Sequence, residues 1–246
     1  MALDPIAMTN VMLARAFSKG LFNAPPEFGL SRTYFTIAKG IVQAILDPTA
    51  TIITVAYGPG QPLVTPPVFP ILPGGLAGPV VGLTGLDAET FWPLIQVACG
   101  YFGPYSEPFF YGLGGIIDYL QPTVQMTDLY APTGTGVGTL APGGILFDAD
   151  KCFDNMHDEA VAQQLMVVRL LVHLSDPLGT YSDPITQLPL GLNDLFSRAE
   201  ILLKASAIQM ASELLKASKI GIPVVGAFLP LPVPPIVGAT ITSVLF

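Results

Sequence analysis

A 39-residue stretch from Pro48 to Leu86 contains no Asp, Glu, Lys or Arg, yet it contains eight prolines and seven glycines. Its apolar composition demands burial, but proline lacks the amide hydrogen that a helix needs and collides with the preceding turn. A continuous membrane helix is therefore excluded here, since irregular backbone facing lipid would leave amide groups unpaired. The sequence predicts an extended or polyproline-like segment that lies against protein surface.

A second uncharged segment covers the last 27 residues, 220–246. One unbroken helix of that length would span a bilayer. Five prolines between positions 223 and 235 interrupt it, which leaves at most 11 residues for a final helix or strand. We therefore expect two Pro/Gly-rich arms, at about 58–86 and 220–246, that extend over neighbouring protein molecules.

The whole chain carries few charges for its size. Of its 246 residues, 11% are charged, against about 25% in an ordinary soluble domain, and its mean hydropathy is +0.59. Such a chain belongs in a membrane, or among partner subunits, or beneath a surface of neutral polar side chains. The net charge of −8 and the lack of any basic run argue against direct binding to nucleic acid, which needs Lys and Arg to neutralise phosphates.

Apolar residues recur at helical spacing in six segments separated by Pro, Gly and Asp. We expect helices at about 5–19, 32–46, 88–101, 112–120, 155–174 and 193–218. Asp4, Ser31, Asp87 and Asp154 precede four of these segments and are expected to be their N-caps. The β-branched segment Thr51–Tyr57 is the best strand candidate. The predicted fold class is mainly α with minor β, in a single domain over residues 1–246 that carries the two arms.

Two segments between the helices are expected to be loops. Residues 103–110 are rich in aromatic side chains, and residues 131–144 consist largely of Gly, Thr and Pro. In the helix expected at 193–218, the helical period assigns one apolar set to the core: Leu195, Ala199, Leu202, Ile208, Ala211, Leu214 and Leu215. Three lysines of this region, Lys204, Lys216 and Lys219, are expected to project outward.

The densest polar cluster extends from Asp148 to Glu159 and also contains His157. Carboxylates at alternating positions are ligands that Ca²⁺ or Mg²⁺ could use, although the spacing departs from that of an EF-hand loop. Acidic residues also belong at a helix N-terminus, where they meet the positive end of the helix dipole. We favour the structural interpretation and keep a divalent-metal enzyme as an alternative.

No arrangement of side chains predicts an active site. The two histidines, His157 and His173, would lie about 24 Å apart on one helix and could not share a metal. The sequence lacks a Gly-x-Ser-x-Gly motif and a Gly-rich phosphate loop followed by Lys. Cys99 and Cys152 have apolar neighbours and are expected to be buried, reduced thiols. We therefore expect no catalytic residue, no metal site and no cofactor.

These features predict a non-enzymatic structural subunit of a large assembly, such as the capsid, neck, tail or baseplate of a virus or phage particle. Its partners would be copies of itself and other assembly proteins, without direct contact to nucleic acid. The first residues form no secretory signal, so assembly in the host cytoplasm and residence in the virion are expected. A membrane-associated protein is the alternative that the hydropathy leaves open.

Large apolar and aromatic side chains are enriched at the centres of protein interfaces. The aromatic segment and the two arms supply such residues, and we expect them to contact neighbouring subunits. The interface candidates are Phe69, Leu72, Phe102, Tyr105, Phe109, Phe110, Phe228, Leu229, Leu231 and Phe246.

Overall fold

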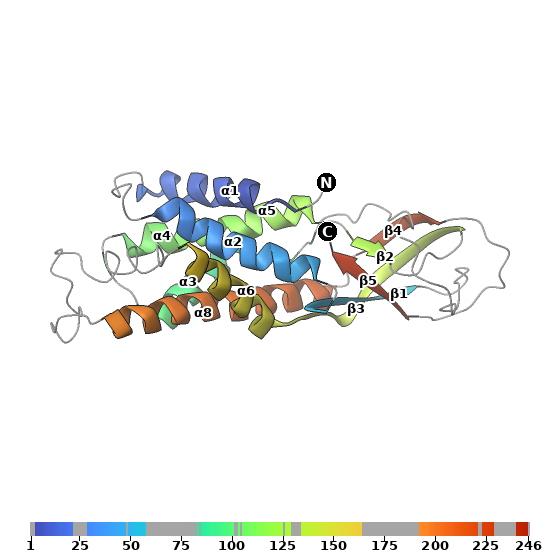
Figure 1. The fold of residues 1–246 in the computed structure, drawn as a ribbon. Helices are drawn as coiled ribbons and strands as arrows, with labels where there is room; N and C mark the ends of the chain where they lie inside the picture. The colour runs from blue at the N-terminus through green and yellow to red at the C-terminus, as the bar shows by residue number, and fades with distance from the viewer. Residues whose placement is uncertain are drawn as a thin grey trace.

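Helices form one end of an elongated molecule and an antiparallel sheet forms the other (Figure 1). The structure is a computed structural model. It describes residues 3–21, 29–47, 49–57, 83, 85–100, 103, 105–124, 126–128, 134–163, 192–220, 223–228 and 240–245. Most of these residues are helical, as the sequence predicts.

The described part of the chain contains seven α-helices. They are α1 (Pro5–Ser18), α2 (Leu30–Leu46), α3 (Ala88–Cys99), α4 (Ser106–Leu113), α5 (Gly115–Thr123), α6 (Ala149–Ala162) and α8 (Leu192–Ile220). The helices predicted at 5–19, 32–46, 88–101 and 193–218 are thus confirmed, with ends shifted by one or two residues. None of the helices described here has both the length and the apolar character that a bilayer crossing requires.

Two of the four predicted N-caps are confirmed. The Asp4 carboxylate accepts a hydrogen bond from the Ile6 N–H, and the Asp87 carboxylate accepts one from the Glu89 N–H, both at 2.9 Å. The prediction for Ser31 is wrong, because α2 begins at Leu30, two residues earlier than predicted, and its N-cap is Gly29. Gly29 has φ +68°, a left-handed conformation that favours glycine.

The prediction of a loop at 103–110 is wrong for residues 106–110, which are helical, whereas the helix predicted at 112–120 is confirmed except at Gly114. Residues Ser106–Leu113 form α4 and Gly115–Thr123 form α5, with Gly114 between them. Leu113 lies four positions after Phe109 and three after Phe110, so the three side chains share one face of α4, and all three are buried. The aromatic segment is helical because this spacing suits a helix face turned toward the core.

The helix predicted at 155–174 begins earlier than expected. Helix α6 starts at Ala149, and Asp148 caps it by accepting hydrogen bonds from the N–H groups of Asp150 and Lys151 at 3.1 and 3.0 Å. Asp154, the predicted cap, lies inside the helix. The segment 164–174 of this prediction lies outside the described residues.

Five strands form one sheet in the order β2-β5-β1-β3-β4, and every described pair is antiparallel. The strands are β1 (Thr51–Tyr57), β2 (Met126–Asp128), β3 (Gly134–Phe147), β4 (Pro223–Phe228) and β5 (Thr240–Leu245). The predicted strand Thr51–Tyr57 is confirmed as β1, the central strand. Its register with β3 shifts between Ile53 and Val55, because β3 has extra residues between Leu140 and Ile145.

Two predictions of irregular structure are corrected by this sheet. Residues 134–144, expected within a flexible loop, belong to the long strand β3. Parts of the predicted arm at 220–246 form β4 and β5, which pair with strands of the same chain. Strand β5 pairs with β1 and β2 on its two sides, whereas β4 is an edge strand that pairs with β3 alone. In the arm predicted at 58–86, Leu83 and Leu86 are buried in the core, and residues 58–82 lie outside the described residues.

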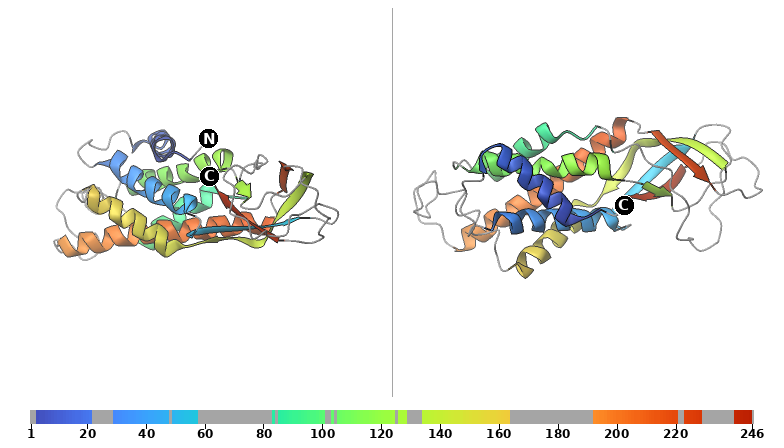
Figure 2. Two further views of the ribbon diagram at one scale, coloured as in Figure 1. Left: turned by 45° about the vertical axis from the view of Figure 1, so that its right-hand side comes forward. Right: turned by 90° about the horizontal axis from the view of Figure 1, so that it is seen from above.

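The helices enclose the main core. Helix α8 contacts α3, α6 and β3, while α2 contacts α1 and α6; Figure 2 shows the helices gathered side by side in two further views. The largest fully buried side chains include Tyr34, Phe91, Phe109, Phe110, Met8 and Met12. The core is therefore built chiefly from helix faces, and α8 runs along it toward the sheet.

Candidate interaction surface

The acidic cluster is occupied by local structural roles. Asp148 caps α6, as described above, and Asp150 lies exposed in the first turn. The Lys39 ammonium on α2 donates a hydrogen bond to Glu159 at 2.6 Å, and Gln163 donates another at 2.8 Å. The Lys39 hydrogen bond lowers the pKa of Glu159 against the opposing effect of burial. Glu159 thus ties α6 to α2.

No metal site is formed by the described residues: no three His, Cys, Asp or Glu side chains gather closely enough to hold an ion. His157 lies in the third turn of α6, while His173 is outside the described residues. The divalent-metal alternative therefore gains no support from the side chains around Asp148–Glu159.

The predicted interface aromatics of α4 lie inside the chain's own core. Phe109 and Phe110 are both fully buried. The Tyr34 ring stacks on Phe109 with 5.2 Å between centroids, and its hydroxyl donates a hydrogen bond to the Phe109 carbonyl at 2.6 Å. Burial of these rings needs no neighbouring subunit. Tyr105, one residue before α4, is half-buried against the same core.

The remaining interface candidates lie mostly in the arms. Phe228 ends strand β4, where its backbone is paired with Gly134. The other candidates lie outside the described residues, namely Phe69, Leu72, Phe102, Leu229, Leu231 and Phe246. Their part in an interface stays a prediction.

Both cysteines are buried and free, as the sequence predicts. Burial raises the pKa of the Cys99 thiol to about 12, and burial with the nearby Asp148 charge raises that of Cys152 further. Neither thiol is ionised at neutral pH, so neither is a nucleophile there.

Helix α8 leaves a row of large apolar side chains in solvent. Ile201, Ile208 and Leu215 are 44%, 53% and 40% exposed. The prediction that Ile208 and Leu215 lie in the core is therefore wrong. The same prediction is confirmed for Ala199, Leu202 and Leu214, which are buried together with Met210. Helix α8 is therefore apolar on two faces, of which only one is covered by the described residues.

This row has the spacing of a helix-packing seam. The three residues are seven positions apart, which is the repeat of helices that pack along one another. Single exposed apolar residues are normal on protein surfaces, but an aligned row is a feature of docking sites. The signal was present in the sequence, since a helix that is apolar on two sides has two surfaces to bury.

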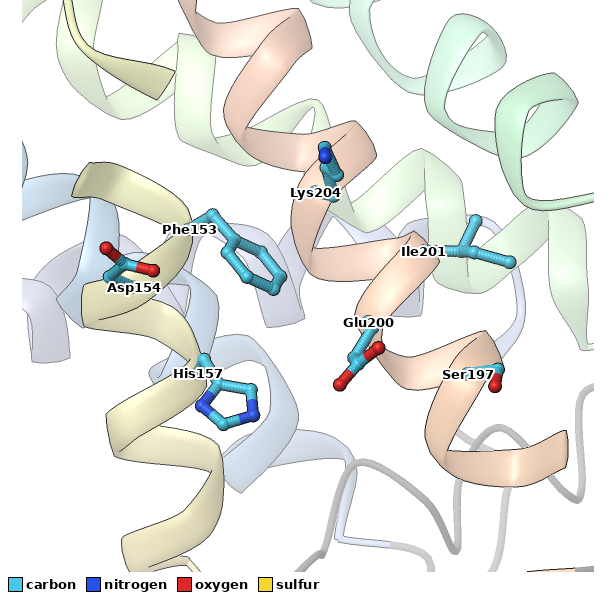
Figure 3. A pocket seen from close by; sticks show the side chains of 7 residues that line it. All are labelled: Phe153, Asp154, His157, Ser197, Glu200, Ile201 and Lys204. Atoms are coloured by element: carbon cyan, nitrogen blue, oxygen red, sulfur yellow. The ribbon is translucent and has the colours of Figure 1, made fainter. Parts of the chain in front are cut away.

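An open groove of about 570 Å³ lies beside the N-terminal half of this row, between α6 and α8. Its lining consists of Phe153, Asp154, His157, Ser197, Glu200, Ile201 and Lys204. Figure 3 shows the Glu200 carboxylate directed toward α6 and His157, whereas Ile201 points away from α6. The groove thus combines an aromatic ring with two carboxylates, and it opens onto the α8 row.

A smaller exposed apolar pair lies on α3. Leu94 and Val97 are 50% and 73% exposed and lie three positions apart on one helix face. They lie on a different helix from the α8 row, and their side chains are about as exposed as those of the row.

The α8 row and the adjoining groove together form the candidate interaction surface, made of apolar, acidic and basic side chains. The sequence matches no family model, and no curated protein or solved structure was found to be similar to it.

Proposed function

We propose that this chain is a structural subunit of a multi-subunit protein assembly, with a virus or phage particle as the first setting to examine. The proposal is supported chiefly by the exposed row Ile201–Ile208–Leu215, which is aligned at heptad spacing on a helix whose other face is buried in the core. Apolar side chains in such a row lose contact with water when another helix packs along them, and this burial favours association.

The composition supports the same proposal. The chain carries only 28 charged residues among 246, too few to solvate the surface of an ordinary monomer of this size. Removing apolar surface at subunit contacts is one way for such a chain to avoid unspecific aggregation. Asp148 and Glu159 are engaged in a helix cap and an ion pair, and both thiols are buried.

The native mass tests this proposal. Sedimentation velocity of the full chain, over a range of concentrations up to the highest attainable, should give a defined species heavier than the 25.9 kDa monomer. Electron microscopy of the same sample should then show whether the species is closed, as a ring or dimer, or extends into a lattice.

A homogeneous monomer of 25.9 kDa at every concentration would contradict the proposal of self-assembly. The viral setting has its own test. Antibodies raised against the purified chain should label particles isolated from the biological source of the chain. Particles that remain unlabelled would exclude the hypothesis that the chain is a virion component.

A further inference from the structure

We propose that two copies of the chain associate through α8, with the two helices antiparallel and Ile208 of each copy at the two-fold axis. The proposal rests on the proposed function as an assembly subunit and specifies its first contact. The partner surface is the same row on a second copy, so the contact closes on itself.

The exposed face of α8 is nearly symmetric about Ile208. At 100° per residue, positions separated by seven differ by only about 20° around the helix. Ile201 and Leu215 therefore flank Ile208 on one stripe, about 21 Å long at 1.5 Å per residue. The same stripe carries four exposed polar residues: Ser197, Lys204, Ser212 and Lys219.

The charges on the stripe select the antiparallel orientation. In a parallel pair, Lys204 would lie against Lys204 of the other copy and Lys219 against Lys219, and like charges directly opposite one another are destabilising. In the antiparallel pair, Ile201 lies opposite Leu215, Lys204 opposite Ser212, and Lys219 opposite Ser197. Apolar residues thus meet apolar residues, and each ammonium meets a hydroxyl.

The groove beside α6 adds charge complementarity to this arrangement. Antiparallel packing brings the C-terminal half of one α8, with Leu215 and Lys219, to the mouth of the groove of the other copy. The groove carries the carboxylates of Asp154 and Glu200. Glu200 is one turn from Ser197, the residue opposite Lys219, so the ammonium of one copy lies within reach of the carboxylate of the other.

The helices that flank α8 lie on either side of the stripe. Glu200 lies on the α6 side, and Lys216, whose ammonium donates a hydrogen bond to the Thr90 hydroxyl of α3, lies on the opposite side. In a two-fold antiparallel pair like sides lie together, so the α6 helices of both copies border the helix pair on one side and the α3 helices on the other.

A charge placed at the axis provides the first test. Ile208→Lys puts two ammonium groups against each other and should reduce the species formed by this contact to half its mass in sedimentation velocity. Ile208 is 53% exposed, so the melting curve of the dissociated chain should be unchanged. The matched control is Val97→Lys on α3, which is 73% exposed and should leave the mass unchanged.

Cysteine cross-linking tests the orientation independently. Ile208→Cys should yield a disulfide-linked species of twice 25.9 kDa on a non-reducing gel after mild oxidation, because facing positions on packed helices come within disulfide reach. The double variant that carries both Lys204→Cys and Ser212→Cys should form disulfides between two copies. Neither single variant should. The native Cys99 and Cys152 are buried and should not contribute.

The outcomes separate this inference from the proposed function. An assembly that keeps its mass in Ile208→Lys and gives no Ile208→Cys dimer overturns the α8 contact while leaving a structural subunit intact. Cross-linking of Lys204→Cys alone would overturn the antiparallel orientation in favour of a parallel one. A wild-type chain that stays monomeric at every concentration overturns both the α8 contact and the proposal of self-assembly.

Discussion

Gly40 on α2 lies against the backbone of Met156 on α6. A β-carbon at Gly40 would come within 2.8 Å of the Met156 amide nitrogen and 2.9 Å of its Cα, and it would overlap the Met156 side chain. The two helices approach this closely because Gly40 has no side chain. The hydrogen-bonded ion pair Lys39–Glu159 lies beside this contact and joins the same two helices.

Gly40→Ala should therefore destabilise the fold. Because the obstructing atoms include backbone, α2 and α6 must move apart, at a cost of about 1–3 kcal/mol, even though alanine favours the helix by about 1 kcal/mol. Urea denaturation followed by circular dichroism measures the difference. Gln43→Ala, at an exposed position on the same helix, is the control and should change the free energy of unfolding by less than about 0.5 kcal/mol. Equal stability of both variants would refute the close contact.

Glu213 should contribute more to the stability of the fold than a charged residue at the surface does. Its fully buried carboxylate on α8 accepts hydrogen bonds from the backbone N–H of Asp87 at 3.1 Å and from Gln209 at 3.0 Å, and it pairs with Lys216. Glu213→Ala leaves the Asp87 N–H and the Gln209 amide without this acceptor and should cost about 3 kcal/mol.

Glu213→Gln is the matched variant, since its amide oxygen can still accept the hydrogen bond from Asp87. It should therefore lose less stability than Glu213→Ala in the same denaturation experiment. If the two variants are equally unstable, the hydrogen bond to the start of α3 contributes nothing and the charge alone matters.

The ion pair of Lys39 and Glu159 should make stability depend on pH. The pKa of Glu159 is lowered in the folded chain, so its stabilising effect is present above the unfolded pKa of about 4.3 and is lost as the pH falls through the folded pKa. Lys39→Met should cost about 1–2 kcal/mol at pH 7, since the Lys39 side chain is 35% exposed and partly screened. The difference from wild type should shrink below about pH 4.

Lys19→Met provides the control for this prediction. Lys19 and Glu107 are 3.3 Å apart, but their side chains are 45% and 55% exposed. Removing this surface pair should change the free energy of unfolding by less than about 1 kcal/mol, and salt should weaken even that effect. If the free energy of unfolding of Lys39→Met changes with pH in parallel with that of wild type, the Lys39–Glu159 pair is not the cause of the pH dependence.

The two thiols should be unreactive while the chain is folded. Burial raises the pKa of Cys99 to about 12 and that of Cys152 further, and both side chains are at most 9% exposed. A thiol reagent at pH 8 should therefore label neither cysteine in native buffer and both in concentrated urea, as counted by mass spectrometry. Rapid labelling of either residue in native buffer would place it at the surface.

Local signals in the sequence predicted the helices that begin with a strong cap. Asp4 and Asp87 bind N–H groups only two residues away, so their effect needs no tertiary contact. The predicted start of α6 was wrong because the acidic cluster offers several possible N-caps. Asp148 is the actual cap, and it accepts hydrogen bonds from two N–H groups. A pattern of charge shows where a helix begins, but it does not choose among adjacent candidates.

The candidate surface was harder to predict than the helix that carries it. The 3.6-residue period assigned Ile208 and Leu215 to the core, because an apolar residue favours burial wherever a partner is available. The prediction was right for Leu202 and Leu214, which are buried with Met210 on the other face of α8. Which of two apolar faces is covered depends on where α3 and α6 pack, and the sequence of α8 does not contain that information.

The sequence alone determined that most of the described chain is helical, because capping and helical periodicity act between residues within one or two turns of each other. Only the tertiary structure decided that Gly134–Phe147 forms a strand and that Pro223–Phe228 and Thr240–Leu245 join the same sheet. A strand gains its hydrogen bonds from a partner that lies far away in the chain. The pairing of Gly134 with Phe228 is set by the folded arrangement of the whole molecule, which no local pattern encodes.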